Sequence, residues 1–139
     1  MLFVPNIIWT KNKPGDYDNY SKDENRTLSL IERIGQVLVV CCLFFADNIS
    51  FTPWILVLVM AFIFMILYEL YWLNYFRSPK TMKDMYFSFL GIPVAGATLP
   101  VLAFLFLGIY KMNLFLIIAA LVLAIGHIGI HMEYERRIK

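Results

Sequence analysis

The chain has little of what soluble enzymes are built from. Only 16% of its 139 residues are charged and 60% are hydrophobic, whereas a soluble domain averages about 25% charged residues. It carries two cysteines and two histidines. Because Cys41 and Cys42 are adjacent within an apolar run, neither a disulfide framework nor a Cys-x-x-Cys redox motif is available. This composition predicts an integral membrane protein.

The sequence also lacks the short motifs that mark common enzymes. It contains no Gly-x-Ser-x-Gly, no Gly-x-x-x-x-Gly-Lys and no Gly-x-Gly-x-x-Gly pattern. Its 12 basic residues are spread mainly over segments that flank apolar runs, where attraction to anionic lipid explains them. We therefore expect the lipid bilayer as a partner, and no nucleic acid.

What the chain does have is long apolar runs, which predict an all-α bundle of four transmembrane helices. A hydrocarbon core of about 30 Å takes roughly 20 helical residues per crossing. The expected helices cover residues 22–45, 53–76, 82–110 and 114–136, within one domain over residues 21–139. Residues that cap helices stand at the expected starts: Ser21 with Glu24, Thr52 before Pro53, Ser78 before Pro79 or Thr81 with Asp84, and Asn113.

Residues 1–20 precede this domain. Their apolar part, "LFVPNIIW", is too short to cross a membrane and contains Pro5 and Asn6. It is either a segment lying in the membrane interface or the remnant of a further span. The rest is polar and carries the turn formers Pro14 and Gly15, which predicts a loop.

The third expected helix is interrupted by prolines. Pro93, Gly96 and Pro100 fall on one face at helical spacing. Each proline removes a backbone hydrogen bond, so we expect the helix of residues 82–110 to be bent. This face either exposes carbonyl groups to a cavity, as broken helices do in transporters, or packs closely against a neighbouring helix.

The basic residues alternate along the chain. Five lie before or within the first half of the first helix, none in the next loop, three in the middle loop, one in the last turn and three in the tail. Cytoplasmic loops carry the excess of Lys and Arg. The pattern predicts a multi-pass protein of a bacterial-type plasma (inner) membrane with its C-terminus in the cytoplasm.

Polar residues gather in the cytoplasmic third of this predicted bundle. At 1.5 Å per residue, Arg33, Glu69 and His127 each lie about 9–12 Å from the nearest inner charge on their helices. An ionised Glu69 within a span needs a partner, for which Arg33 is the first choice and His127 the second. The predicted polar site consists of Glu32, Arg33, Gln36, Glu69, His127 and His131.

This site has three interpretations. It is a structural cluster that fixes helix register; it binds or moves a small solute or a proton; or it serves a membrane-embedded enzyme that acts on lipid or binds a metal. We favour the solute or proton. Four spans are few for a carrier, so this function implies a homo-oligomer or a membrane-protein partner. The structural cluster fits a subunit of a membrane complex.

The two histidines also allow a metal site. His127 and His131 are four residues apart, so both can reach one divalent ion from the same helix face. Glu69 or Glu135 would supply a third ligand. The residues between the histidines are Ile128, Gly129 and Ile130, which offer no general base, so the motif of zinc proteases is absent.

Overall fold

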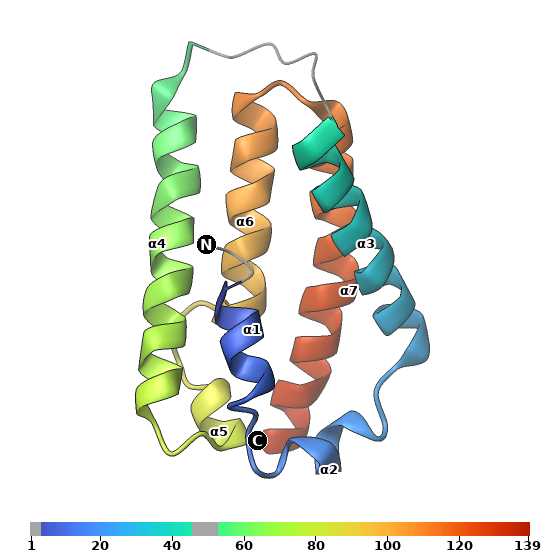
Figure 1. Ribbon diagram of the computed structural model, residues 1–139, viewed down its shortest axis with the longest axis vertical. Coiled ribbons are helices and arrows are strands. Elements are labelled where there is room, and N and C mark those ends of the chain that lie inside the picture. Colours follow the sequence, from blue (N-terminus) through green and yellow to red (C-terminus); the bar gives the residue numbers. More distant parts are fainter. Residues whose placement is uncertain (1–3, 46–52) are drawn as a thin grey trace.

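The computed structural model describes residues 4–45 and 53–139 (Figure 1). The expected all-helical fold is confirmed, since all regular elements in these residues are helices. The seven helices are α1 (Val4–Thr10), α2 (Tyr17–Ser21), α3 (Arg26–Phe45), α4 (Ile55–Arg77), α5 (Met82–Met85), α6 (Ala95–Tyr110) and α7 (Leu114–Ile138).

Three of these helices are long and apolar enough to cross a membrane. They are α3, α4 and α7, with 20, 23 and 25 residues. The fourth apolar helix, α6, has 16 residues and is about 24 Å long at 1.5 Å per residue. Of the four spans predicted from the sequence, α6 is therefore the one that falls short of a hydrocarbon core of about 30 Å.

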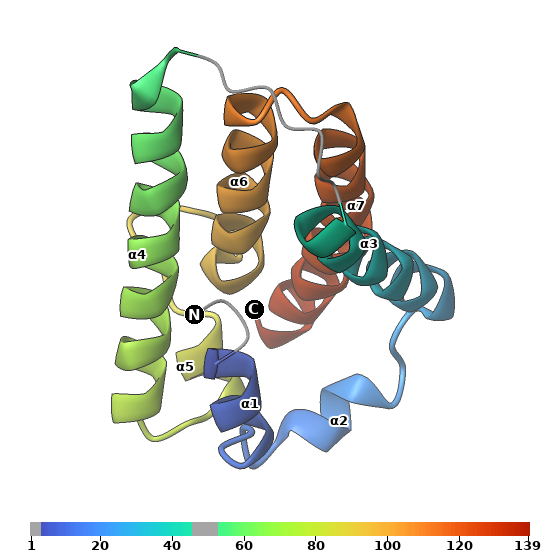
Figure 2. The ribbon, with the colours of Figure 1, turned by 45° about the horizontal axis from the view of Figure 1, so that its top comes forward.

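The long helices are arranged as an arc. α3 packs along α7, α7 along α6, and α6 along α4, so that α3 and α4 stand at the two ends of the row (Figures 1 and 2). The short α1 lies between these two ends and close to α4, where the Tyr68 hydroxyl donates to Asn6 Oδ1 at 3.4 Å. The arc leaves an interior space that is bounded by α1, α3, α4, α6 and α7.

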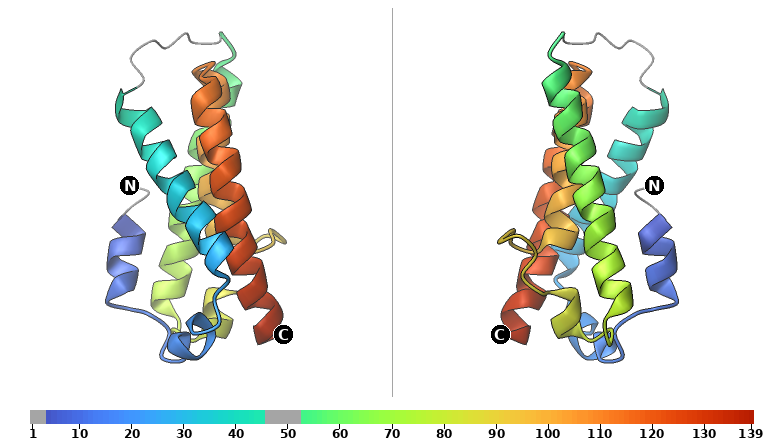
Figure 3. Two further views of the ribbon diagram at one scale, coloured as in Figure 1. Left: turned by 90° about the vertical axis from the view of Figure 1, so that its right-hand side faces the viewer. Right: turned by 90° about the vertical axis from the view of Figure 1, so that its left-hand side faces the viewer.

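Two glycines bring α3 and α7 together. A Cβ atom on Gly126 would lie 2.2 Å from the backbone nitrogen of Glu32, and one on Gly35 would lie 2.5 Å from Leu123 Cα. Small residues allow this close approach of helix backbones in membranes, and α3 crosses α7 at an angle (Figure 3). The crossing sets the Glu32 side chain beside the residue that follows Gly126.

The predicted continuous helix over residues 82–110 is wrong. The capping box of Thr81 and Asp84 is present, but it starts only the four-residue α5. A turn with positive φ at Leu90, Gly91 and Val94 then separates α5 from α6. Left-handed residues stop a right-handed helix, so the turn at residues 86–94 replaces the expected bend.

Pro93 and Pro100 consequently occupy different structural positions. Pro93 is exposed in the turn, one residue before the N-cap of α6, and its carbonyl accepts from Thr98 Oγ1 at 2.7 Å. Pro100 is buried inside α6. Since its ring removes a hydrogen bond only near the start of the helix, the helix continues past it to Tyr110.

The other helix starts differ less from expectation. α3 begins at Arg26 rather than residue 22, because Asn25 Oδ1, and not the Ser21 side chain, accepts from the backbone N–H groups of Thr27 and Leu28 at 3.0 and 3.3 Å. The cap by Asn113 is confirmed, with Leu116 N donating to Oδ1 at 3.0 Å. The predicted cap at Thr52 lies outside the described residues.

The segment of residues 11–25 covers one end of the bundle. Asn12 Oδ1 accepts from Lys80 Nζ at 2.7 Å, and its carbonyl accepts from the Tyr75 hydroxyl at 2.8 Å. Asp16 Oδ1 accepts from Met82 N at 3.1 Å. These bonds tie the segment to α4 and α5 and close the end of the interior space where α7 terminates, which we call the polar end.

Candidate functional site

The interior space is a cavity of about 650 Å³. This volume lies within the range of sites that hold drug-sized ligands. Toward the polar end the lining side chains include Glu24, Glu32, Gln36, His127, His131 and Tyr134. Farther along the helices they include Val37, Val40, Pro100, Phe104 and Leu123. The cavity therefore has a polar half and an apolar half.

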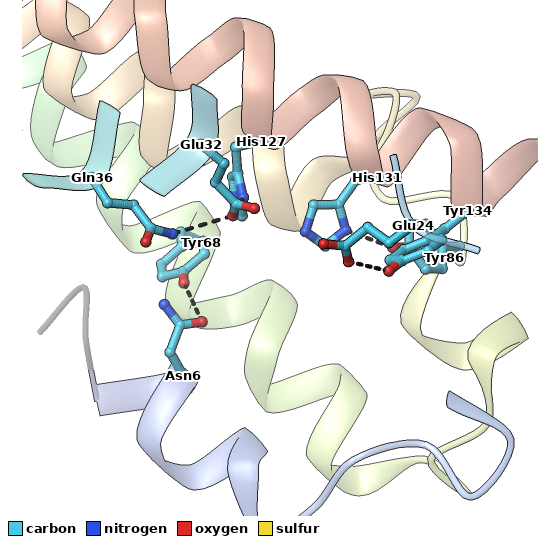
Figure 4. Close-up of polar contacts among 9 residues, drawn as sticks. All are labelled: Asn6, Glu24, Glu32, Gln36, Tyr68, Tyr86, His127, His131 and Tyr134. Atoms are coloured by element: carbon cyan, nitrogen blue, oxygen red, sulfur yellow. Dashed lines mark hydrogen bonds and ion pairs between the residues drawn. The ribbon is translucent and has the colours of Figure 1, made fainter. Parts of the chain in front are cut away.

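A hydrogen-bonded group at the polar half joins α3 to α7. His127 Nδ1 lies 2.5 Å from Glu32 Oε1, and Gln36 Nε2 donates to the same oxygen at 3.2 Å (Figure 4). The Glu32 and His127 side chains are 19% and 21% exposed. Gly126 makes this pair possible, since it brings the α7 backbone against Glu32 one residue before the histidine.

A second group lies closer to the end of α7. His131 Nδ1 is 2.5 Å from the Tyr86 hydroxyl, and the Tyr134 hydroxyl donates to Glu24 Oε2 (Figure 4). Tyr86 lies in the turn after α5, where burial raises the pKa of its phenol far above the usual value. The phenol thus stays neutral at physiological pH.

Aromatic rings form much of the wall on the side of α1 and α4. Trp9 meets Tyr17 edge-on, with ring centroids 5.0 Å apart, and Tyr68 meets Trp72 edge-on at 6.1 Å. All four residues line the cavity. Edge-on pairs of this kind stabilise the wall beyond the area that they bury.

The structure separates two residues that the sequence analysis paired. Arg33 is exposed on α3, whereas Glu69 lies on α4 at the other end of the arc. In the part of the chain that the structure describes, the buried Glu69 Oε1 has no hydrogen-bond partner. The expected pairing with Arg33 or His127 is therefore not formed. Glu32 precedes Arg33 on α3, so its side chain points about 100° away from that of Arg33 around the helix axis. It is Glu32 that contacts His127.

Of the helix-bend face, Gly96 and Pro100 line the cavity and Pro93 does not. A Cβ on Gly96 would lie 2.6 Å from Tyr71 Cε1, so this glycine also allows a tyrosine ring to pack on α6. The Tyr71 hydroxyl donates to the carbonyl of Met85. Gly96 and Pro100 thus line the cavity, and Gly96 also packs closely against α4.

Among the described residues, no third ligand lies beside the two histidines of the expected metal site. The His127 and His131 rings are close, with centroids 4.7 Å apart, and each Nδ1 already contacts another side chain. Glu135 pairs instead with Lys139 at 2.9 Å. Within residues 4–45 and 53–139, no group of three or more His, Cys, Asp or Glu side chains is placed to hold a metal ion.

Sequence reasoning missed Glu24, Tyr86 and Tyr134 as parts of the site. Tyr134 had a readable signal, because it lies seven residues after His127 on the same face of one helix. Glu24 and Tyr86 come from the segments before α3 and after α5. Helical periodicity carries no information about such positions.

No protein-family model, no curated protein and no solved structure matches this chain. Its function must be inferred from its own geometry. The feature that distinguishes the fold is a sizeable cavity with a polar and an apolar half, lined in part by the three membrane-length helices α3, α4 and α7.

Proposed function

We propose that this protein binds a small amphiphilic solute within the membrane, in the cavity between α3, α4, α6 and α7. The division of the cavity into two halves supports this function. Glu32, Gln36 and His127 supply hydrogen-bonding groups at one end, and Val40, Phe104 and Leu123 among others supply an apolar surface at the other. A solute with a polar head and an apolar body matches both.

The opening of the cavity supports entry from the bilayer. Gln36, Val37 and Cys41 line the cavity and are also exposed on α3, and Val37 is 62% exposed. An amphiphilic solute in the bilayer reaches these residues of α3 by lateral diffusion, without first entering water.

The alternating basic residues orient the site. In a bacterial-type plasma membrane with a cytoplasmic C-terminus, the polar end lies at the cytoplasmic surface. Residues 11–25 cover that end through the contacts of Asn12 and Asp16. Binding from the membrane is therefore the step that this conformation supports, and passage of the solute into the cytoplasm would require these contacts to open.

A matched pair of substitutions on α3 tests the function. Val37→Trp places a large ring at the mouth of the cavity, whereas Leu38→Trp adds the same ring one position away, at an exposed residue that does not line the cavity. Native mass spectrometry of protein extracted from its own membranes should detect a small bound molecule in the wild type. The bound mass should be lost in Val37→Trp and kept in Leu38→Trp.

Two results would contradict the proposal. One is a wild-type protein that carries no small molecule and takes up none when amphiphiles are added. The other is equal retention of bound mass in both tryptophan variants, which would place the bound molecule outside the cavity.

A further inference from the structure

The lining of the cavity carries two carboxylates, those of Glu24 and Glu32, beside the imidazoles of His127 and His131. Among the described residues that line the cavity, none is a lysine or an arginine. Phosphate and carboxylate groups are recognised by arginine forks, lysines and helix N-termini. The N-terminal turn of α6 lines the cavity, but Ala97 N and Thr98 N already donate to the carbonyl of Val94. This cavity is therefore poorly suited to an anionic head group and favours a cationic one.

The Glu32 carboxylate has one oxygen available as an acceptor for a ligand. Its contacts with His127 and Gln36 both use Oε1, which leaves Oε2 free of those two bonds. An ammonium group has three donors and no acceptor. Such a group can bond the second oxygen of Glu32 without disturbing the contacts that join α3 to α7.

The aromatic wall adds an attraction for cations. The faces of Trp and Tyr rings attract ammonium groups within about 6 Å of their centroids. Two of the rings that line the cavity already form cation–π contacts with a lysine of the chain. Lys13 Nζ lies 5.3 Å from the centroid of Trp9 and 5.5 Å from that of Tyr17. Tyr68 and Trp72 extend this aromatic wall of the cavity.

We propose that the solute is a lipophilic amine in its ammonium form. Its head group binds between Glu24 and Glu32 and beside the aromatic wall, and its apolar body lies against Val40, Phe104 and Leu123. This inference rests on the proposed function, because it names the chemical class of the molecule that the cavity takes. It adds the requirement that the head group of this molecule carries a positive charge.

Tryptophan fluorescence provides a local readout. The chain has three tryptophans, of which Trp9 and Trp72 line the cavity. A Trp54→Phe background leaves these two as the only tryptophans. Three probes are used, each with a dodecyl chain and a bromobenzyl group next to its head group. The head group is a secondary amine in the first probe, an ether in the second and a carboxylate in the third. Bromine quenches tryptophan on contact, so saturable quenching in lipid nanodiscs at neutral pH reports occupation of the cavity.

We expect the amine to bind at least about tenfold more tightly than the ether, and the carboxylate to bind least. Glu32→Gln keeps the shape of the side chain and removes its charge, and should weaken amine binding about tenfold or more, so that most of the preference for the amine over the ether is lost. Glu69→Gln is the matched control, because Glu69 also lies on a membrane-length helix but does not line the cavity. It should bind the amine like the parent. Should Glu32→Gln not fold, Glu24→Gln is used in its place.

The failures of the two proposals are distinguishable. Equal saturable binding of amine and ether, unaltered by Glu32→Gln and Glu24→Gln, would overturn the cationic ligand and retain the amphiphile cavity. Preferential binding of the carboxylate would also overturn it. Quenching by none of the three probes beyond simple partition into lipid would overturn both proposals.

Discussion

Gly126→Ala is expected to destabilise the bundle by about 2–3 kcal/mol, although alanine is the better helix former by about 1 kcal/mol. The added methyl group would lie 2.2 Å from the Glu32 backbone nitrogen and 2.6 Å from its Cα. Backbone atoms cannot rotate away as side chains can, so α3 and α7 must separate. The loss of unfolding free energy is measured by titration with a denaturing detergent.

Two other glycines serve as controls. A Cβ on Gly15 would meet no atom within 4 Å, so Gly15→Ala should change the unfolding free energy by no more than about 0.5 kcal/mol. A Cβ on Gly129 would approach only side-chain atoms of Leu28, at 3.2 Å. Gly129→Ala should therefore cost much less than Gly126→Ala. A stabilising effect of Gly126→Ala would refute the close crossing of α3 and α7.

His127→Ala should destabilise the protein by about 2–3 kcal/mol, because it leaves the largely buried Glu32 carboxylate with one of its two hydrogen bonds. Glu32→Ala should lower the free energy of unfolding by a similar amount, because it leaves the His127 imidazole without this partner. The double substitution should cost less than the sum of the single ones, since each single change leaves an unpaired polar group that the other removes. We expect a coupling of about 1–2 kcal/mol, measured as a double-mutant cycle of unfolding free energies.

Arg33 provides the control for this cycle. It is the neighbour of Glu32 but is exposed, so Arg33→Ala combined with His127→Ala should give additive costs. A cycle in which Arg33, and not Glu32, couples to His127 would restore the pairing expected from the sequence. It would also contradict the orientation of α3 described above.

Much of the helical framework could be predicted from composition and spacing. Apolar runs of about 20 residues predicted α3, α4 and α7, because backbone groups in lipid must bond within their own segment. The Asn113 cap and the Thr81 capping box were readable as local signals. The break between α5 and α6 was not, since residues other than glycine that adopt positive φ, such as Leu90 and Val94, leave no mark on the sequence.

The site could be predicted only where one helix carried the information. His127, His131 and Tyr134 share a face of α7 by periodicity alone. The partner of His127 depends on the rotation of α3 about its own axis. That rotation places Glu32 and not Arg33 against α7, and it is set by the contacts of Gly35 and Gly126 across the crossing. The order of the helices in the arc, which removes Glu69 from the site, is likewise a tertiary property.

Photolabelling can locate a bound amphiphile directly. The protein in nanodiscs is irradiated with a dodecylamine that carries a diazirine on its chain, and the labelled residues are mapped by mass spectrometry. We expect labelling of cavity residues such as Val40, Cys41 and Phe104, suppressed by excess unlabelled dodecylamine. Labelling confined to outward residues of α4 such as Phe62 and Ile66, without suppression by competitor, would contradict the claim that the cavity binds an amphiphile.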